Sequence, residues 1–223
     1  MLTRVTFTGL DDNTNIDDLL ALEKEFAHIN IEWGILFSAK RGTDRYPSPY
    51  KVNEALSKLK NCSAHLCGAV FDNFYNNPFG YNYGRFKRIQ LNFNTRNISA
   101  LRLSTIFKMY PEKEFILQYN KSNKDVIEYL TKYKNTNWTV LFDSSGGHGV
   151  SVQEWPKPLE YVACSYAGGL GPHNLGVELP RICDITGELP FGIDMEGQIR
   201  TDNKFDVHKV KQVLEIVSEQ IKK

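Results

Sequence analysis

Polar side chains that could move protons or hold an anion follow several short apolar runs of this sequence. They comprise hydroxyl, amide, carboxylate and cationic groups, in chain order Thr8, Lys40, Arg41, Arg45, Asp72, Asn73, Asn92, Tyr119, Asn120, Asp143, Ser144, Ser145, Asp194 and Glu196. Acid–base catalysis needs two such groups poised across a substrate. We take Asp143 as the candidate general acid. Contacts to a substrate are expected from Arg45, Asn92, Asp194 and Glu196.

Glycine-rich segments follow some of the same runs and suit an anion. Gly168 and Gly169 separate an apolar run from a helical pattern, and Gly147 and Gly197 lie in two further loops. Glycine lets backbone N–H groups approach a ligand, and the N-terminus of a following helix favours negative charge. We therefore expect these four glycines to bind a phosphate. The alternative is a plain turn, since left-handed turns also require glycine.

The elements that must position these residues follow from alternating apolar runs and amphipathic segments. Eight strands are expected, at 4–8, 33–37, 64–71, 88–91, 115–118, 138–142, 161–165 and 191–194. Helices are expected between most of them; Ser48 and Pro49 open one, and Asp206 caps the last. The segment 73–84 is aromatic and rich in Asn and Gly, which predicts an irregular connection.

Strands that alternate with helices predict a parallel sheet. The strand count and the length of 223 residues favour its closure into a single-domain (β/α)8 TIM barrel over residues 1–223. In this architecture the C-terminal ends of the strands form the active site, and the loops after strands seven and eight often bind phosphate. The polar residues and the glycines are thus predicted to share one mouth.

Composition narrows the function classes. With 41% hydrophobic and 24% charged residues and a net charge of +1, the chain has material for a core and no general attraction to nucleic acid or an anionic membrane. No apolar stretch approaches a membrane span and no secretory signal is visible, so we expect a cytoplasmic protein. Cys62, Cys67, Cys164 and Cys183 lack zinc or redox spacing, so no metal and no cofactor is expected. The expected partner is a small phosphorylated metabolite, and the protein a monomer or homodimer.

An ordered set of motifs resembles the phosphoribosylanthranilate isomerase family. Residues 5–10 (Val-Thr-Phe-Thr-Gly-Leu) are similar to its first-strand motif, in which a Cys precedes Gly-Leu. Further similarities lie at 45–49 (Arg-Tyr-Pro-Ser-Pro), 89–91 (Ile-Gln-Leu), 141–149 with Trp155, and 167–170 (Ala-Gly-Gly-Leu) with Asn174. The resemblance runs from residue 5 to about residue 200 and is more specific for the ribulose-phosphate-binding class of barrels than for this enzyme.

The resemblance implies an Amadori rearrangement of a phosphoribosyl amine, an aldose–ketose isomerisation. It makes Asp143 the acid that opens the sugar ring, and Arg45 a contact to the anthranilate portion. The base of the family is the strand-one Cys, where this chain has Thr8. A threonine hydroxyl has no accessible pKa near neutrality, whereas a thiol ionises near pH 8.5. Thr8 remains a candidate catalytic residue, and the proton-abstraction step departs from the family.

Two further departures bear on chemistry. Glu196 places a negative charge near the expected phosphate, so it must point away, meet a cation, or exclude a phosphate. His148 replaces Thr or Ser in a glycine-rich loop and is a candidate acid–base group, because histidine titrates near neutral pH.

Structural roles are the alternatives at each of these positions. Asp143 could pair with Arg45 or Lys40, His148 could pack on Trp155, and Asp194 or Glu196 could pair with Arg200 or Arg4. The segment 71–83 is either a substrate lid or a packed surface loop. At the level of the whole protein, the alternatives are a divergent barrel with changed chemistry and a non-catalytic phosphometabolite-binding protein.

Overall fold

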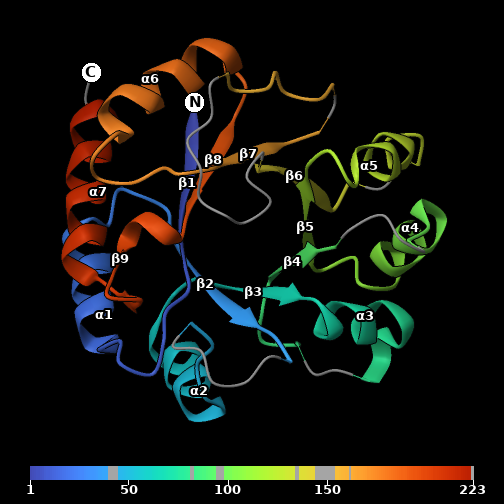
Figure 1. Ribbon diagram of the computed structural model, residues 1–223, viewed down its shortest axis with the longest axis horizontal. Helices are drawn as coiled ribbons and strands as arrows, with labels where there is room; N and C mark the ends of the chain where they lie inside the picture. The colour runs from blue at the N-terminus through green and yellow to red at the C-terminus, as the bar shows by residue number, and fades with distance from the viewer. Residues whose placement is uncertain are drawn as a thin grey trace.

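A computed structural model describes residues 1–39, 45–80, 83–93, 98–133, 136–143, 154–160 and 162–221. Eight parallel strands close into a barrel in chain order, which confirms the predicted fold class (Figure 1). They are β1 (Leu2–Thr8), β2 (Ile31–Phe37), β3 (Cys62–Cys67), β4 (Arg88–Asn92), β5 (Glu114–Tyr119), β6 (Trp138–Asp143), β7 (Cys164–Ala167) and β8 (Phe191–Met195). The last strand pairs with the first, with Thr6 opposite Asp194.

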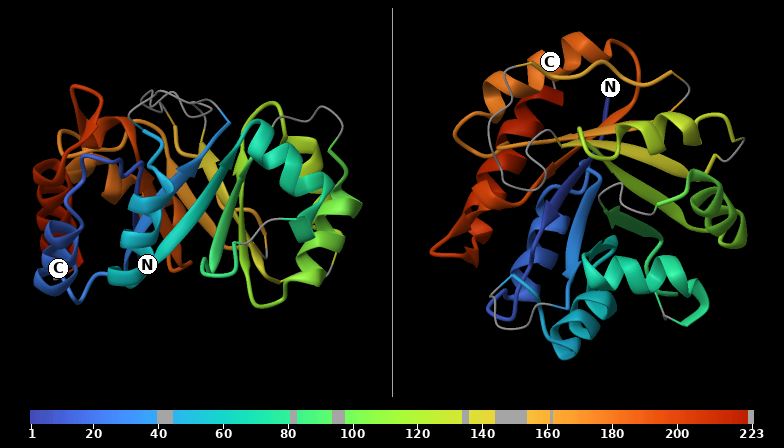
Figure 2. Two further views of the ribbon diagram at one scale, coloured as in Figure 1. Left: turned by 90° about the horizontal axis from the view of Figure 1, so that it is seen from below. Right: turned by 45° about the vertical axis from the view of Figure 1, so that its right-hand side comes forward.

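Helices surround the strands on the outside (Figure 2). They are α1 (Ile16–Glu25), α2 (Pro49–Lys58), α3 (Ala69–Asn76), α4 (Ala100–Met109), α5 (Lys124–Leu130), α6 (Leu175–Thr186) and α7 (Val207–Ile221). Two 3-10 turns, η1 (Pro78–Gly80) and η2 (Gly197–Ile199), and a small hairpin of β9 (Arg200–Thr201) and β10 (Lys204–Phe205) complete the described elements. Within the described residues, no helix is both long and apolar enough to cross a bilayer.

Local sequence explains where several helices begin. The side chains of Asn15, Ser48 and Ser99 accept hydrogen bonds from backbone N–H groups in the first turns of α1, α2 and α4. Asp206 does the same at α7, accepting from His208 N and Lys209 N. The predicted caps at Ser48 and Asp206 are thus confirmed.

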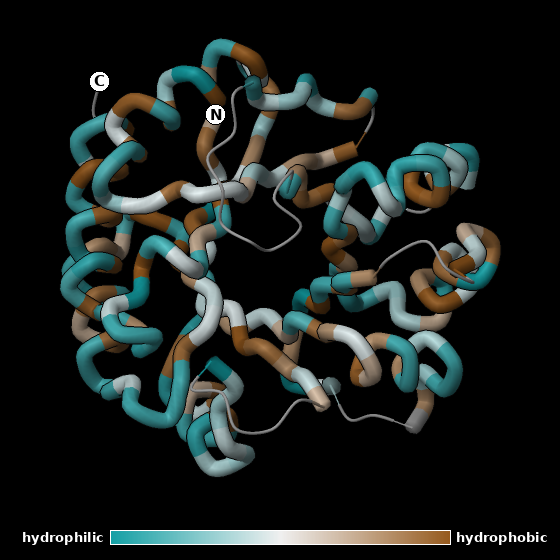
Figure 3. Tube along the Cα trace, viewed as in Figure 1, coloured by the Kyte–Doolittle hydropathy of each residue, from teal (hydrophilic) through white to brown (hydrophobic). Residues whose placement is uncertain are grey.

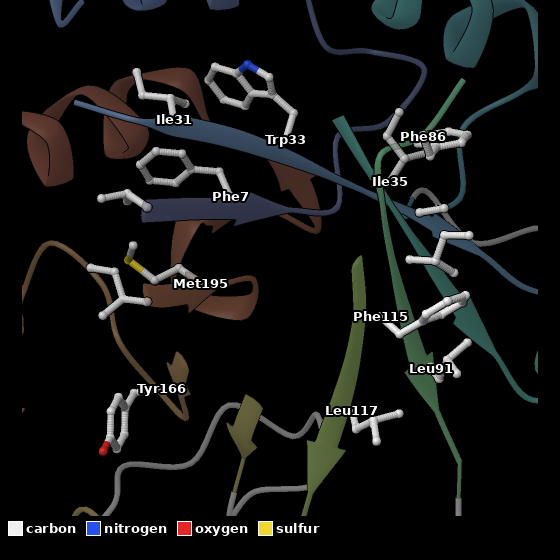
Figure 4. Close-up of a cluster of buried hydrophobic side chains, with 14 of the residues drawn as sticks. Phe7, Ile31, Trp33, Ile35, Phe86, Leu91, Phe115, Leu117, Tyr166 and Met195 are labelled. Atoms are coloured by element: carbon white, nitrogen blue, oxygen red, sulfur yellow. The ribbon is translucent and has the colours of Figure 1, made fainter. Parts of the chain in front are cut away.

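The main apolar core lies between the strands and the helices. Hydropathy along the chain shows apolar segments in the strands and mixed stripes in the helices around them (Figure 3). Phe7, Trp33, Met195 and Tyr166 belong to this core and are at most 2% exposed (Figure 4). Each comes from a strand, and their neighbours in sequence must therefore point the other way, into the barrel.

The barrel interior is unusually polar for this architecture, in which bulky branched side chains dominate. Buried polar side chains occupy alternate positions of the strands: Thr6, Thr8, Glu32, Ser63, His65, Arg88, Gln90, Gln118, Asp143 and Asp194. The short apolar runs predict where these strands lie, but they did not predict a polar residue at every second position.

Two elements differ from the sequence prediction. The third connection, predicted to be irregular over 73–84, is helical at its start, because α3 extends to Asn76 and buries Phe71, Phe74 and Tyr75 at helical spacing. The preceding strand ends at Cys67, where Gly68 adopts a positive φ of 54°. The seventh strand, predicted at 161–165, lies at Cys164–Ala167 instead. The buried rings of α3 also contradict the idea that this part of the chain is a lid.

Candidate active site

Two buried carboxyl groups, Asp143 and Asp194, lie at the carboxyl ends of β6 and β8. Strand register pairs Asp143 with Ala167 and Ala167 with Asp194, which puts both aspartates at one level of the barrel. The residues are 5% and 9% exposed, and the charge of Asp143 acts on Asp194. The structure thus brings two of the sequence-predicted site residues together.

Thr8 contacts Asp194 directly. Its Oγ1 donates a hydrogen bond of 2.7 Å to Asp194 Oδ1 across the β1–β8 junction. Thr8 is 3% exposed and lies one residue beyond the last β1–β8 register pair. The position that resembles the family's basic Cys is therefore filled by a hydroxyl that holds a carboxyl group.

The environment of Asp194 tunes its acidity. Burial raises the pKa of Asp194 to about 7, because a carboxylate loses its hydration there. The hydrogen bond from Thr8 opposes this rise, the charges of Glu32 and Asp143 add to it, and Arg88 opposes it. A carboxyl group with a pKa of about 7 can both give and take a proton at neutral pH.

Asp143 is held by a neighbouring strand. Gln118 Nε2 donates a hydrogen bond of 2.6 Å to Asp143 Oδ2, and Gln118 is itself buried. This hydrogen bond fixes the orientation of the Asp143 carboxyl group at the end of β6. Asp194 and Asp143 thus sit in different environments, which is how paired carboxyl groups take separate acid and base roles.

Arg45 and Glu196 form an ion pair after β2 and β8. Their side chains are 42% and 22% exposed, so the pair lies in partial contact with solvent. Glu196 therefore meets a cation, one of the three outcomes expected from its charge. Its partner is Arg45, whereas Arg200 pairs with Asp11 and Arg4 with Glu32.

Asn92 lies at the end of β4 within a short chain of side-chain contacts. It accepts from Gln90 Nε2 at 3.0 Å and donates from Nδ2 to Cys67 Sγ at 3.2 Å. Burial raises the pKa of the Cys67 thiol, although Asn92 and Arg45 both oppose the rise. Cys67 is thus protonated at neutral pH and is a poor substitute for the basic thiol that Thr8 replaces.

The glycines after β7 have the backbone that the sequence analysis anticipated. Gly168 and Gly169 adopt φ values of 127° and 65°. Asn174 fixes the turn, because its Nδ2 donates to Gly169 O and its Oδ1 accepts from Gly171 N, each at 3.0 Å. Helix α6 begins directly afterwards, so its N-terminus lies beside the turn.

Of the other two glycines expected to bind phosphate, Gly197 is described by the structure and Gly147 is not. Gly197 begins the 3-10 turn η2 after β8. Gly147 and His148 lie outside the residues that the structure describes. Nothing in the described residues tests phosphate binding at any of these positions.

A layer of charged side chains lies below the aspartates, toward the amino ends of the strands. Arg88 contacts Glu32 at 2.5 Å and Glu114 at 3.0 Å, and Arg4 approaches both glutamates at 3.8 Å. Burial works to raise the pKa of Glu32, but Arg88 and Arg4 outweigh it, so the pKa is lowered. Two cations and two anions compensate one another in this layer.

A cavity of about 1170 Å³ opens at this amino-terminal end, with Arg4, Arg88 and Glu114 in its lining. Its lining includes none of Thr8, Asp143 and Asp194, so the cavity lies apart from the proton-transfer groups described above. In the part of the chain that the structure describes, no three His, Cys, Asp or Glu side chains are grouped to hold a metal ion.

Sequence reasoning missed several residues around the aspartates, including Gln118, Cys67, His65 and Gly34. The available signal was the two-residue alternation of polar and apolar side chains in the strands. Their partners, however, come from distant strands, and a single sequence does not show such pairings.

Comparison with solved structures supports the fold. The chain is similar to N-(5'-phosphoribosyl)anthranilate isomerase from Pyrococcus furiosus, with 12% identity, a TM-score of 0.57, and coverage of 97% of this chain and 99% of that one. For 3-hexulose-6-phosphate synthase from Salmonella typhimurium the identity is 8% and the TM-score 0.54, with the same coverage.

A third similar structure is a truncated form of 3-deoxy-D-arabino-heptulosonate 7-phosphate synthase from Thermotoga maritima. It is 13% identical, with a TM-score of 0.58 and coverage of 99% of this chain and 87% of that one. No protein-family model matches the chain, and no curated protein matches it by sequence. At these identities the likeness establishes the architecture that these enzymes share, a closed (β/α)8 barrel.

Proposed function

We propose that this protein is an acid–base isomerase of a phosphorylated ribose or ribulose derivative. The observation that carries the proposal is Asp194, a buried carboxyl group with a pKa of about 7, beside a second carboxyl group at the mouth of the barrel. Such a pair supplies one proton donor and one proton acceptor at neutral pH. The resemblance of the motifs and the names of the similar structures support the substrate class.

The two aspartates take distinct roles in this proposal. Asp194 in its protonated form donates its proton to the ring oxygen as the C1–O bond opens. Asp143, whose Oδ2 accepts from Gln118, takes the proton from C2. Asp143 then returns this proton to C1 of the enolamine, and the C2 hydroxyl gives its proton to Asp194, which yields the ketose and restores both carboxyl groups. The resemblance assigns the acid to Asp143, and the environments of the two groups favour the reverse assignment.

Thr8 has a supporting role in the reaction, because its hydroxyl holds Asp194 and has no accessible pKa of its own. The phosphate is proposed to lie at Gly168 and Gly169, beside the N-terminus of α6. Arg45 is neutralised by Glu196 in the structure, so a substrate anion must displace Glu196 to use it.

Conversion of N-(5'-phosphoribosyl)anthranilate, followed by loss of its fluorescence, tests the narrowest form of the proposal. Exchange of the C2 proton in heavy water, followed by NMR with a panel of pentose phosphates, tests the wider substrate class. Asp143→Asn and Asp194→Asn should each abolish turnover, whereas Asp184→Asn, an exposed carboxyl of α6, should not. Turnover that survives in both site variants would refute the proposed mechanism.

Thermal-shift measurements with the same phosphates separate catalysis from binding. Stabilisation by a pentose phosphate without conversion or exchange would favour a non-catalytic phosphometabolite-binding protein. If the tested phosphates neither stabilise the protein nor undergo exchange, they are excluded as substrates, and the protein has a changed chemistry.

A further inference from the structure

We infer that Gly34 and His65 are positioning residues that keep the hydroxyl of Thr8 on Asp194. Neither was a candidate from the sequence. The inference rests on the proposed acid–base role of Asp194, and it concerns how the barrel interior holds that group.

Gly34 leaves a space that two other side chains fill. It pairs with Thr8 on β1 and with Ser63 on β3, so its missing side chain would point into the barrel beside theirs. A Cβ built at Gly34 would lie under 3.0 Å from Thr8 Oγ1 and 2.9 Å from both Cε1 and Nε2 of His65. Real Cβ atoms essentially never approach so closely, so any other residue at this position requires a neighbour to move.

Neither neighbour can move freely. The ring of His65 is 1% exposed and its Nε2 shares a hydrogen bond of 3.0 Å with Ser63 Oγ. The Thr8 hydroxyl is held at 2.7 Å by Asp194. Threonine is branched at Cβ, so rotation about χ1 carries its oxygen to a different side of the chain. A methyl group at Gly34 should therefore push the hydroxyl off Asp194.

His65 bounds the same space from β3. Burial lowers the pKa of His65 to about 4, with Glu32 opposing this effect and Arg88 adding to it. The ring is therefore neutral at neutral pH and adds no positive charge beneath the carboxyl group. Its Nδ1 has no hydrogen-bond partner among the described residues. His65 therefore contributes its bulk to the wall of the space at Gly34.

The consequence for Asp194 has a definite direction. Thr8 lowers the pKa of Asp194, whereas burial, Glu32 and Asp143 raise it and Arg88 lowers it. Loss of the Thr8 hydrogen bond should therefore raise the pKa further, by about one unit for a bond to a charged group. The acid would then hold its proton too tightly at neutral pH.

Asp194 can be titrated by carboxyl carbon NMR in the full chain, with Asp194→Asn to assign its signal. Gly34→Ala should raise the pKa by about one unit, as should Thr8→Val. Gly192→Ala is the matched control, because it also adds a Cβ at a strand glycine. That Cβ would lie 2.6 Å from Ser165 Oγ and not beside Thr8. In the double variant Gly34→Ala/Thr8→Val, the two shifts should not add.

The readout needs no substrate, so it is independent of whether the isomerase proposal holds. Equal Asp194 pKa values in Gly34→Ala, Gly192→Ala and the unmodified chain would overturn the inference. Should Gly34→Ala fail to fold, the unmodified protein still provides a test through two signals. The Thr8 hydroxyl proton should exchange slowly with solvent, and His65 should stay neutral down to about pH 4. Fast exchange, or a His65 that titrates near pH 6.5, would equally overturn it.

Discussion

The raised pKa of Asp194 makes a measurable prediction about folding. In the unfolded chain an aspartate ionises near pH 3.8, whereas the folded protein holds this proton up to a pH of about 7. Between these values the folded state binds more protons than the unfolded state. Stability must therefore fall as the pH rises through this window, and the loss is complete above about pH 7.

The size of the effect follows from the two values. A separation of about 3 units at about 1.4 kcal/mol per unit amounts to about 4 kcal/mol over the full window. Between pH 5 and pH 7 the share is about 2 kcal/mol, because the group is only half ionised at pH 7. Because Asp194 is 9% exposed, solvent screening reduces this figure little.

Asp194→Asn removes this titration and keeps the shape of the side chain. Its amide oxygen can still accept from Thr8, and its amide nitrogen can donate toward Asp143. The free energy of unfolding of the variant should rise by about 3 kcal/mol relative to the unmodified protein between pH 5 and pH 8. Comparing two pH values cancels any fixed cost of the substitution.

Urea denaturation at pH 5, 6, 7 and 8 measures the change. Asp184→Asn serves as the control, since that carboxyl is exposed on α6 and should leave the pH dependence unaltered. If the stability curves of Asp194→Asn and the unmodified protein ran parallel from pH 5 to pH 8, Asp194 would be ionised throughout. The reasoning from burial to proton affinity would then be refuted.

Three other substitutions test contacts of the fold and the mouth. Glu32→Gln leaves Arg88 buried without its closest partner and should cost about 3–5 kcal/mol of unfolding free energy in urea denaturation. The carboxylate of Glu114 is 31% exposed, so Glu114→Gln should cost clearly less. Equal losses would show that burial does not set the difference. Ser48→Ala removes the cap of α2 and should cost about 1 kcal/mol, whereas Ser57→Ala on the exposed face of that helix should cost almost nothing. Glu196→Gln should change the free energy of unfolding by less than about 1 kcal/mol, because the ion pair is partly exposed. It should also tighten the binding of inorganic phosphate in calorimetry, because it frees Arg45. An unchanged affinity would show that Arg45 does not reach the anion.

The barrel was predictable because its signal is periodic and local. Short apolar runs at regular spacing, with caps such as Ser48 and Asp206, indicate strands and helices before any contact is known. The prediction failed at α3, where Asn-rich composition outweighed the helical spacing of Phe71, Phe74 and Tyr75. Tertiary burial of these rings stabilises a helix that its own residues favour weakly.

The candidate site was predictable only in part. Asp143 and Asp194 follow apolar runs, so parallel strand topology alone places them at one rim. Their hydrogen-bond partners were invisible, since Thr8 is 186 residues from Asp194 and Gln118 is 25 from Asp143. The role of Gly34 is to leave space for side chains of the neighbouring strands. Nothing in its local sequence distinguishes it from a glycine that is needed for a turn.

The charged layer beneath the aspartates explains why a buried carboxyl group can sit above buried ions and still titrate near neutrality. Glu32 raises the pKa of Asp194 and Arg88 lowers it, so a compensated pair changes the field at Asp194 far less than either charge alone. Replacing a whole buried ion network by apolar residues is often neutral for stability, whereas removing one member is costly. The layer therefore leaves burial and the hydroxyl of Thr8 as the main influences on the pKa of Asp194. Arg88→Met alone should break this balance, leave Glu32 with the more distant Arg4 as its remaining cation, and raise the pKa of Asp194 while weakening the fold.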